Sequence, residues 1–278
     1  ARRLDASRPG AGAPDLGLGP VLQLSQGGGA PLFAVHPAGG LAWCYRSLAL
    51  ALPGVTVVGL QSPLLDPDTP TPASLGALAQ RYMDRVEALQ PQEPLTLLGW
   101  SLGGIIAHAM AAEAERRGRE VARLVLLDAY PSGCWRNAPE PDDGAALRAL
   151  LAIAGFDPEA HADLVTRAEV MGFLRLKGNA LALLPEAVQT GVIRSVQATN
   201  ALVRGHQEPR VAAPLLHVTA TRDQEGSGRH AGLWQAFAGG VERLELDCRH
   251  QDLIAPDRVA EVVAAMAGRR LPSLMPVR

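Results

Sequence analysis

The stretch Leu95–Met110 constrains the fold more than any other part of the chain. It begins with apolar residues typical of a strand, then reaches a turn at Gly99-Trp-Ser-Leu-Gly103, and continues to Arg117 without a proline. This pattern predicts a strand, a sharp turn and a helix. Ser101 lies on the turn, where a side chain two residues before or after it would obstruct the backbone, and both of those positions are glycine.

The predicted turn gives this serine a chemical role. A hydroxyl on a strand-to-helix turn stands above the edge of the sheet, at the positive end of the helix dipole. Gly-x-Ser-x-Gly between a strand and a helix is the nucleophile elbow of the α/β-hydrolases. Gly104 follows directly and lets the helix pack close to its neighbours. The motif is weak alone, but its predicted strand and helix make it specific.

The remaining pattern predicts an α/β fold around this elbow. Short apolar runs typical of buried parallel strands alternate with longer runs of helical periodicity. This order predicts an α/β-hydrolase fold, with a mainly parallel central sheet flanked by helices. The other expected strands are 21–25, 31–36, 55–59, 120–128, 214–220 and 241–246, and the other expected helices of the main fold are 42–52, 74–90, 229–237 and 256–267.

A long helical insertion interrupts the alternation between residues 133 and 205. It holds three helical stretches, at 143–154, 158–176 and 185–204, and no strand pattern. We interpret it as a lid over the active site, the alternative being a cap that only covers the core.

The ends of the chain lack any periodic pattern. We therefore expect a flexible linker at residues 1–20, one α/β-hydrolase domain at 21–270, and a flexible tail at 271–278. Because the chain starts without Met, we interpret it as a segment of a longer protein.

Composition narrows the range of partners. The net charge of −2 gives no reason to expect nucleic acid or an anionic membrane surface. We expect no membrane span, because no apolar run reaches 18 residues, and no secretory signal. Three widely spaced cysteines without a C-x-x-C pair argue against a disulfide framework or a zinc site. They fit a reducing compartment, so we expect a cytoplasmic location.

A nucleophilic serine needs a base, and His250 is the best candidate. It follows the last predicted strand and precedes the last helix, which completes the hydrolase order of serine, aspartate and histidine. His36 also ends a strand but precedes the serine. We interpret His108 and His217 as core residues, and the remaining histidines, in loops or the helical insertion, as solvated: His161, His206 and His230.

Two aspartates are candidates for the acid that orients this base. Asp128 follows its strand directly, whereas Asp223 lies three residues beyond the apolar part of the next strand, in a Gly-rich loop. Direct attachment to the strand favours Asp128, but the residues alone leave both open. Asp247 and Asp252 lie too close to His250 along the chain to orient its ring.

The oxyanion of an acyl-transfer reaction needs two backbone N–H donors. One is expected from Leu102, the residue after the nucleophile, and the other from the loop after an early strand. That loop is His36-Pro-Ala-Gly-Gly40, and because proline has no N–H, Ala38 is the expected donor.

Several of these segments resemble type I thioesterase domains of nonribosomal peptide synthetases. The resemblance extends over about residues 31–267. The segments that carry it are His36-Pro-Ala-Gly-Gly-Leu-Ala-Trp-Cys-Tyr45, Gly59-Leu-Gln61, Leu97-Leu-Gly-Trp-Ser-Leu-Gly-Gly-Ile-Ile-Ala-His-Ala109 and Leu124-Val-Leu-Leu-Asp-Ala-Tyr-Pro131. It implies Asp128 as the acid, an upstream peptidyl carrier domain as partner, and no cofactor in this domain beyond the carrier's own phosphopantetheine. We expect a monomeric domain.

The resemblance also implies a serine thioesterase or cyclase. A peptidyl chain would pass from the carrier's phosphopantetheine to Ser101 and leave by hydrolysis or macrocyclisation. The alternatives are a stand-alone esterase, a type II proofreading thioesterase, or a non-catalytic carrier-docking domain. Type II enzymes usually have Gly-His-Ser-Met-Gly at the elbow, so Trp100 and Leu102 argue against that class.

Overall fold

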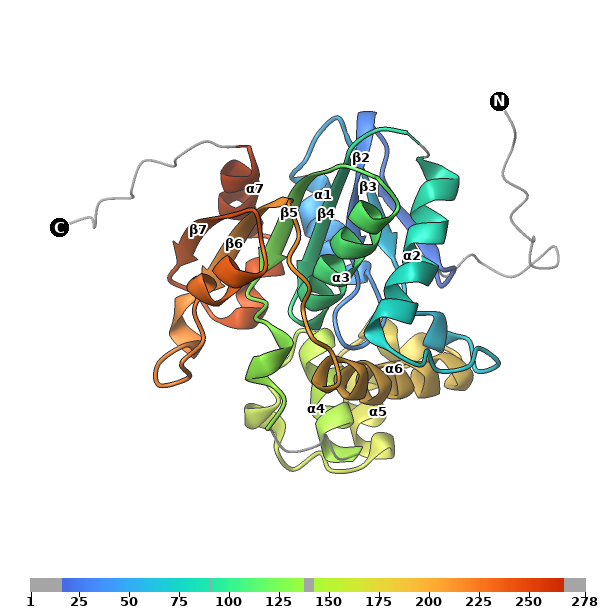
Figure 1. The fold of residues 1–278 in the computed structure, drawn as a ribbon. Coiled ribbons are helices and arrows are strands. Elements are labelled where there is room, and N and C mark those ends of the chain that lie inside the picture. The colour runs from blue at the N-terminus through green and yellow to red at the C-terminus, as the bar shows by residue number, and fades with distance from the viewer. Residues whose placement is uncertain (1–16, 91, 138–142, 268–278) are drawn as a thin grey trace.

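The computed structural model describes residues 17–90, 92–137 and 143–267 (Figure 1). In this part of the chain seven strands form one sheet, in the order β1-β3-β2-β4-β5-β6-β7. Strand β1 pairs antiparallel with β3, and every other neighbouring pair is parallel. The strands are Val21–Ser25, Gly28–Val35, Val55–Leu60, Leu95–Trp100, Val121–Leu127, Pro214–Ala220 and Gly240–Leu246, β1 to β7 in order.

Helices cover both faces of the sheet, which explains why the central strands are apolar throughout. Helices α2 (Leu75–Leu89) and α3 (Leu102–Arg116) pack on one face. Helices α1 (Arg46–Leu50) and α7 (Val259–Met266) pack on the other. The predicted α/β-hydrolase architecture, a mainly parallel sheet between helical layers, is therefore confirmed.

The helical insertion lies at one end of the sheet (Figure 1). It contains α4 (Asp143–Ile153), α5 (Arg167–Leu176) and α6 (Glu186–Arg204). These helices share a third apolar cluster of their own, which also includes Leu41 and Leu65 of the main fold. The insertion is thus attached to the main fold through apolar contacts.

Some predicted helices are shorter in the structure. The stretch 158–176 contains a 3₁₀ turn at Glu159–His161, and α5 begins only at Arg167. Thr166 and Glu169 form a capping box there, which satisfies the first N–H groups and sets the new start. The stretch 229–237 is a 3₁₀ helix at Ala231–Ala236.

The predicted linker and tail fall mostly outside the described residues, since 1–16 and 268–278 are not described. Residues 17–20 are described and are attached to the main fold. The side-chain amide of Gln61 donates to the carbonyls of Gly17 and Gly19, at 2.8 and 2.7 Å. None of the helices in the described ranges has the length and apolar character required to cross a lipid bilayer.

Candidate active site

The elbow is built as tightly as its glycines predict. A Cβ atom at Gly99 would lie 2.1 Å from the carbonyl oxygen of Gly103. A Cβ at Gly103 would lie 2.5 Å from the carbonyl oxygen of Val35, and one at Gly104 would lie 2.3 Å from the Ala129 Cβ. These distances exclude any side chain, so the glycines let α3 start directly against β2 and the end of β5.

Ser101 and Asp128 both have backbone conformations that L-residues rarely adopt. Their φ angles are 58° and 46°, and no other non-glycine residue of the described chain has a positive φ. Ladder hydrogen bonds hold both in place, from Ser101 N to Leu127 O and from Asp128 N to Val218 O. Strained residues held by their surroundings cluster at functional sites. Here they follow two adjacent strands, β4 and β5.

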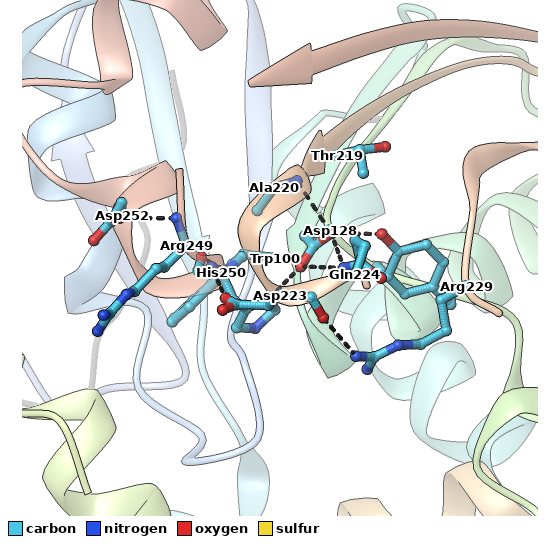
Figure 2. Close-up of polar contacts among 12 residues, drawn as sticks. Trp100, Asp128, Thr219, Ala220, Asp223, Gln224, Arg229, Arg249, His250 and Asp252 are labelled. Carbon is cyan, nitrogen blue, oxygen red and sulfur yellow. Dashed lines mark hydrogen bonds and ion pairs between the residues drawn. The ribbon is translucent and has the colours of Figure 1, made fainter. Parts of the chain in front are cut away.

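Asp128 and His250 lie in direct contact (Figure 2). Asp128 Oδ2 accepts a hydrogen bond from His250 Nδ1 at 2.6 Å. Asp128 Oδ1 accepts from the hydroxyl of Tyr130 at 2.6 Å, from Gln224 Nε2 at 3.0 Å and from Ala220 N at 3.3 Å. A carboxylate at Nδ1 keeps the proton there, so Nε2 of the neutral ring is left as the basic nitrogen.

The environment keeps the Asp128 carboxyl ionised. Its side chain is 3% exposed, and burial alone would raise its pKa. The hydrogen bond and charge of His250 oppose this effect, together with the hydrogen bonds from Tyr130 and Ala220, and the net pKa is lowered. Asp128 is therefore a carboxylate that can stabilise a protonated His250.

The backbone of His250 is held on both sides by residues whose role the sequence did not reveal. Its N–H donates to Asp223 Oδ2 at 2.5 Å. Its carbonyl accepts from Trp100 Nε1 at 3.1 Å, and the indole lies against the imidazole with ring centroids 5.0 Å apart. The two candidate acids thus contact the same histidine differently, Asp128 at the ring and Asp223 at the main chain.

A cavity of about 400 Å³ brings the predicted residues together. It is lined by all five of them, Ser101, Asp128, His250, Ala38 and Leu102. Helices α4 and α6 of the insertion supply part of its wall, through Ala145, Ala149, Val196 and Asn200. Within the described structure no hydrogen bond joins the Ser101 hydroxyl to His250. Such contacts often shorten only when substrate is bound.

The loop that carries Ala38 is a compact turn. Gly40 N donates to the carbonyl of Pro37 at 3.0 Å, and Ser62 N donates to the carbonyl of Gly40 at 2.8 Å. Beneath the turn, His36 Nδ1 donates to the Pro37 carbonyl at 2.6 Å, and the Tyr82 hydroxyl donates to His36 Nε2. Burial lowers the pKa of His36 to about 4, so it stays neutral and supports the loop.

Comparison with known proteins places this chain in a family. The family model described as "Thioesterase domain" matches residues 30–268. The chain belongs to the thioesterase domain family. The domain is therefore of hydrolase type, and the relatives described next confirm the resemblance to thioesterase domains of nonribosomal peptide synthetases.

The curated relatives of this thioesterase domain are much longer proteins. It is 35% identical over 242 residues to a dimodular nonribosomal peptide synthase of Bacillus subtilis (strain 168), covering 85% of this chain and 10% of that protein. It is 30% identical over 258 residues to enterobactin synthase component F of Escherichia coli (strain K12), covering 91% and 19%. The chain thus spans a tenth to a fifth of the length of these relatives.

Solved structures share the fold. A four-domain nonribosomal peptide synthetase bound to AMP and glycine matches with a TM-score of 0.76 and 23% identity, over 93% of this chain and 20% of that one. The thioesterase domain that cyclises the lipopeptide antibiotic surfactin matches with a TM-score of 0.65 and 19% identity, over 93% and 100%.

The other histidines of the thioesterase domain have structural positions. His217 is buried, and its Nε2 donates to the carbonyl of Ala129 at 2.9 Å, which fixes the backbone next to Asp128. His108 is buried against Trp234. His161 and His206 are half-buried rather than solvated, because His161 packs on Phe156 and Phe173 and His206 lies in a partly covered loop. His230 is exposed.

Metal ligands do not gather in the described part of this domain, where no three His, Cys, Asp or Glu side chains lie together as a metal ion would require.

Proposed function

We propose that this thioesterase domain releases a peptidyl chain from the phosphopantetheine thioester of a carrier domain, through an acyl-O-Ser101 intermediate. One observation carries the proposal. The Asp128–His250 pair, joined at 2.6 Å, lines the same cavity as a serine on a strained elbow. The relatives are synthetases of which this domain is a small part, which supports a carrier domain as the partner.

The first half of the reaction forms the ester. His250 Nε2 takes the proton of the Ser101 hydroxyl, and the serine oxygen attacks the thioester carbonyl. The N–H groups of Ala38 and Leu102 stabilise the oxyanion. Asp128 stabilises the protonated imidazole. The tetrahedral intermediate then collapses, the carbon–sulfur bond breaks, and His250 returns the proton to the pantetheine thiol.

The second half releases the chain. His250 takes a proton from the attacking group, which adds to the ester carbonyl. The bond from the carbonyl carbon to the Ser101 oxygen then breaks, and His250 returns the proton to that oxygen. Water as the attacking group gives a linear acid, and an amine or hydroxyl of the peptide itself gives a macrocycle. The cavity wall from the insertion includes Ala145, Ala149 and Val196, which are apolar and restrict water around the ester.

The domain organisation expected from the sequence is part of this proposal. We propose that the thioesterase domain spans residues 21–270. The expected linker at 1–20 lies mostly, and the expected tail at 271–278 wholly, outside the described residues. The insertion at 133–205 acts as the lid. The domain works as a monomer, and it needs no cofactor other than the arm carried by its partner.

Mass spectrometry of products from a synthetic peptidyl-pantetheine thioester tests this function. From the wild type we expect a linear acid or a macrocycle as product and a peptidyl adduct on Ser101. From Ser101→Ala we expect no released product and no adduct. Turnover of the thioester by Ser101→Ala at the wild-type rate would overturn the proposal. Faster turnover of p-nitrophenyl esters than of peptidyl thioesters would favour a stand-alone esterase.

A further inference from the structure

One arginine of the active-site cavity has no role in the chemistry described above. Arg229 lies on the loop between β6 and β7, and it is the one Lys or Arg side chain among the described residues that line the cavity. Its guanidinium carbon lies 5.6 Å from the ring centroid of Tyr130 and 5.2 Å from that of Trp135. Two aromatic rings therefore hold the cation in a defined place at the cavity wall (Figure 2 shows its position beside Asp223 and Gln224).

The charge of Arg229 is not neutralised by the protein around it. Its guanidinium donates a long hydrogen bond, from Nη2 to the backbone carbonyl of Asp223 at 3.4 Å. It forms no ion pair with a carboxylate of the described residues. The two carboxylates that line the cavity are used elsewhere, because Asp128 accepts from the His250 ring and Asp223 from the His250 backbone.

The surroundings make an unpaired guanidinium costly. Arg229 is half-buried, and much of the cavity wall is apolar, including Ile105, Ala145 and Val196. A partly desolvated cation in such a place gains from an anionic partner. The planar guanidinium is best matched by a carboxylate, which it binds through two parallel hydrogen bonds.

The geometry connects this cation to the reacting centre. One of the two rings that face Arg229 belongs to Tyr130, whose hydroxyl donates to Asp128. A group bound to Arg229 would therefore be separated by the ring of Tyr130 from Asp128, the proposed acid that orients His250. That places it near the thioester end of an acyl chain whose carbonyl is at Ser101.

We propose that Arg229 is a specificity-determining residue that binds a carboxylate carried by the acyl chain, within a few residues of the thioester. The inference rests on the function proposed above and names the class of acyl chain that this site takes. If Arg229 only held Tyr130 and Trp135 together, its substitution would instead lower the turnover of every substrate equally.

Matched substrates separate the two roles. We would use pantetheine thioesters of short peptides that differ only in Glu or Gln, placed in turn at each of the three residues nearest the thioester. The measurement is the ratio of kcat/KM for the Glu and Gln peptides. For the wild type we expect a preference for Glu of about tenfold or more at one position, the usual worth of a hydrogen bond to a charged group.

Substitutions of Arg229 then test whether this residue causes the preference for Glu. Arg229→Gln should bring the ratio to about one, mainly through KM for the Glu peptide. Arg229→Lys should keep part of the preference, because it retains the charge without the planar fork. The matched control is Arg222→Gln, an arginine near the start of the same loop that pairs with Asp247 at the surface, and it should leave the ratio unchanged.

Two results would overturn the inference. One is a wild-type ratio near one at all three positions, and the other is the same preference in Arg229→Gln as in wild type. Failure of the underlying function is visible separately, since it would appear as equal turnover of the Gln peptide by wild type and Ser101→Ala. Should Arg229→Gln fold poorly by circular dichroism, the wild-type ratio and Arg229→Lys still decide the question.

Discussion

The indole of Trp100 lies against the imidazole of His250, with ring centroids 5.0 Å apart and ring planes at 30°. Trp100 Nε1 also donates to the His250 carbonyl at 3.1 Å. Trp100 immediately precedes Ser101, so adjacent residues of the elbow carry the proposed nucleophile and hold the proposed base. The two groups are 149 positions apart in sequence, and this contact fixes their relative placement.

Trp100→Phe tests this contact. It keeps an aromatic face for His250 but removes the N–H donor, so we expect kcat for thioester turnover to fall about 2- to 10-fold with little change in KM. The matched control is Trp43→Phe, which removes the donor to the Gly17 carbonyl at the edge of the main fold. An unchanged kcat in Trp100→Phe would show that the hydrogen bond does not position the base.

The backbone of Ser101 predicts a trade-off between activity and stability. Its φ of 58° and ψ of −133° favour glycine, because a Cβ is strained there. Ser101→Gly and Ser101→Ala should both be inactive, but the glycine variant should have a free energy of unfolding about 1 kcal/mol higher.

Urea denaturation measures this difference. At Ser47, inside helix α1, the order should be reversed, with the alanine variant more stable than the glycine variant. The same order at both positions would argue against strain at Ser101.

The two aspartates that contact His250 should differ in effect. Asp128→Asn removes the carboxylate that orients the ring, so we expect kcat to fall about 10³- to 10⁴-fold. Asp223→Asn keeps an oxygen that can accept from the His250 backbone N–H, so we expect a loss below about tenfold. Steady-state kinetics on one thioester decide between them, and the opposite ranking would make Asp223 the acid.

Acid should weaken the packing of the elbow helix. The Glu113 carboxylate accepts hydrogen bonds from Arg116 and Arg117, each at 2.7 Å, and is nearly buried. The hydrogen bond from Arg116 is the main reason that the pKa of Glu113 falls to about 2. Because this pKa is below its ordinary value of 4.5, the stabilisation is complete above pH 4.5 and is lost as the pH falls toward 2.

Glu113→Gln should therefore lower the free energy of unfolding by about 2 kcal/mol at pH 7, and by less as the pH falls from 4.5 to 3. Denaturant titrations at each pH measure the difference. Glu261→Gln, which removes a surface contact to Arg258, should cost less than about 1 kcal/mol. A difference that does not depend on pH would contradict the role of the Glu113 charge.

The contact between the loop that carries Ala38 and the helical insertion can be tested with a compensating substitution. A Cβ at Gly39 would lie 2.0 Å from Cδ1 of Ile153 in α4. Gly39→Ala should therefore cost about 1–3 kcal/mol and reduce activity, whereas adding Ile153→Val, which removes that methyl group, should restore most of both.

Thermal unfolding and thioester kinetics of the two single variants and the double variant provide the cycle. Gly76→Ala in α2, where the nearest atom is 3.7 Å away, should instead stabilise the protein slightly. Additive effects of Gly39→Ala and Ile153→Val would show that the contact does not couple the loop to the insertion.

Much of the fold follows from local pattern. The strand limits 21–25 and 214–220 predicted from the sequence agree with the structure, because short apolar runs between turn residues are specified by their own composition. The helices at 42–52 and 229–237 were predicted too long. Residues there form 3₁₀ turns at Trp43–Tyr45 and Ala231–Ala236. The spacing of apolar residues does not distinguish a 3₁₀ turn from an α-helix, because packing against neighbouring segments determines which of the two forms.

The choice between Asp128 and Asp223 depended on the tertiary structure. Both follow adjacent parallel strands, β5 and β6, and both reach His250, so distance along the chain does not separate them. The direction of each side chain does, since Asp128, with a φ of 46°, bonds the imidazole ring, whereas Asp223 bonds the main chain.

The sequence by itself determined the elbow, the sheet around it and the residues that arrive at its carboxyl edge, because these depend on glycines and apolar residues that are neighbours along the chain. Only the tertiary structure decided which aspartate bonds the ring of His250, that Trp100 supports this histidine, and that Arg229 lines the cavity between two aromatic rings. These are contacts between segments separated by roughly a hundred residues or more, and no local pattern encodes them.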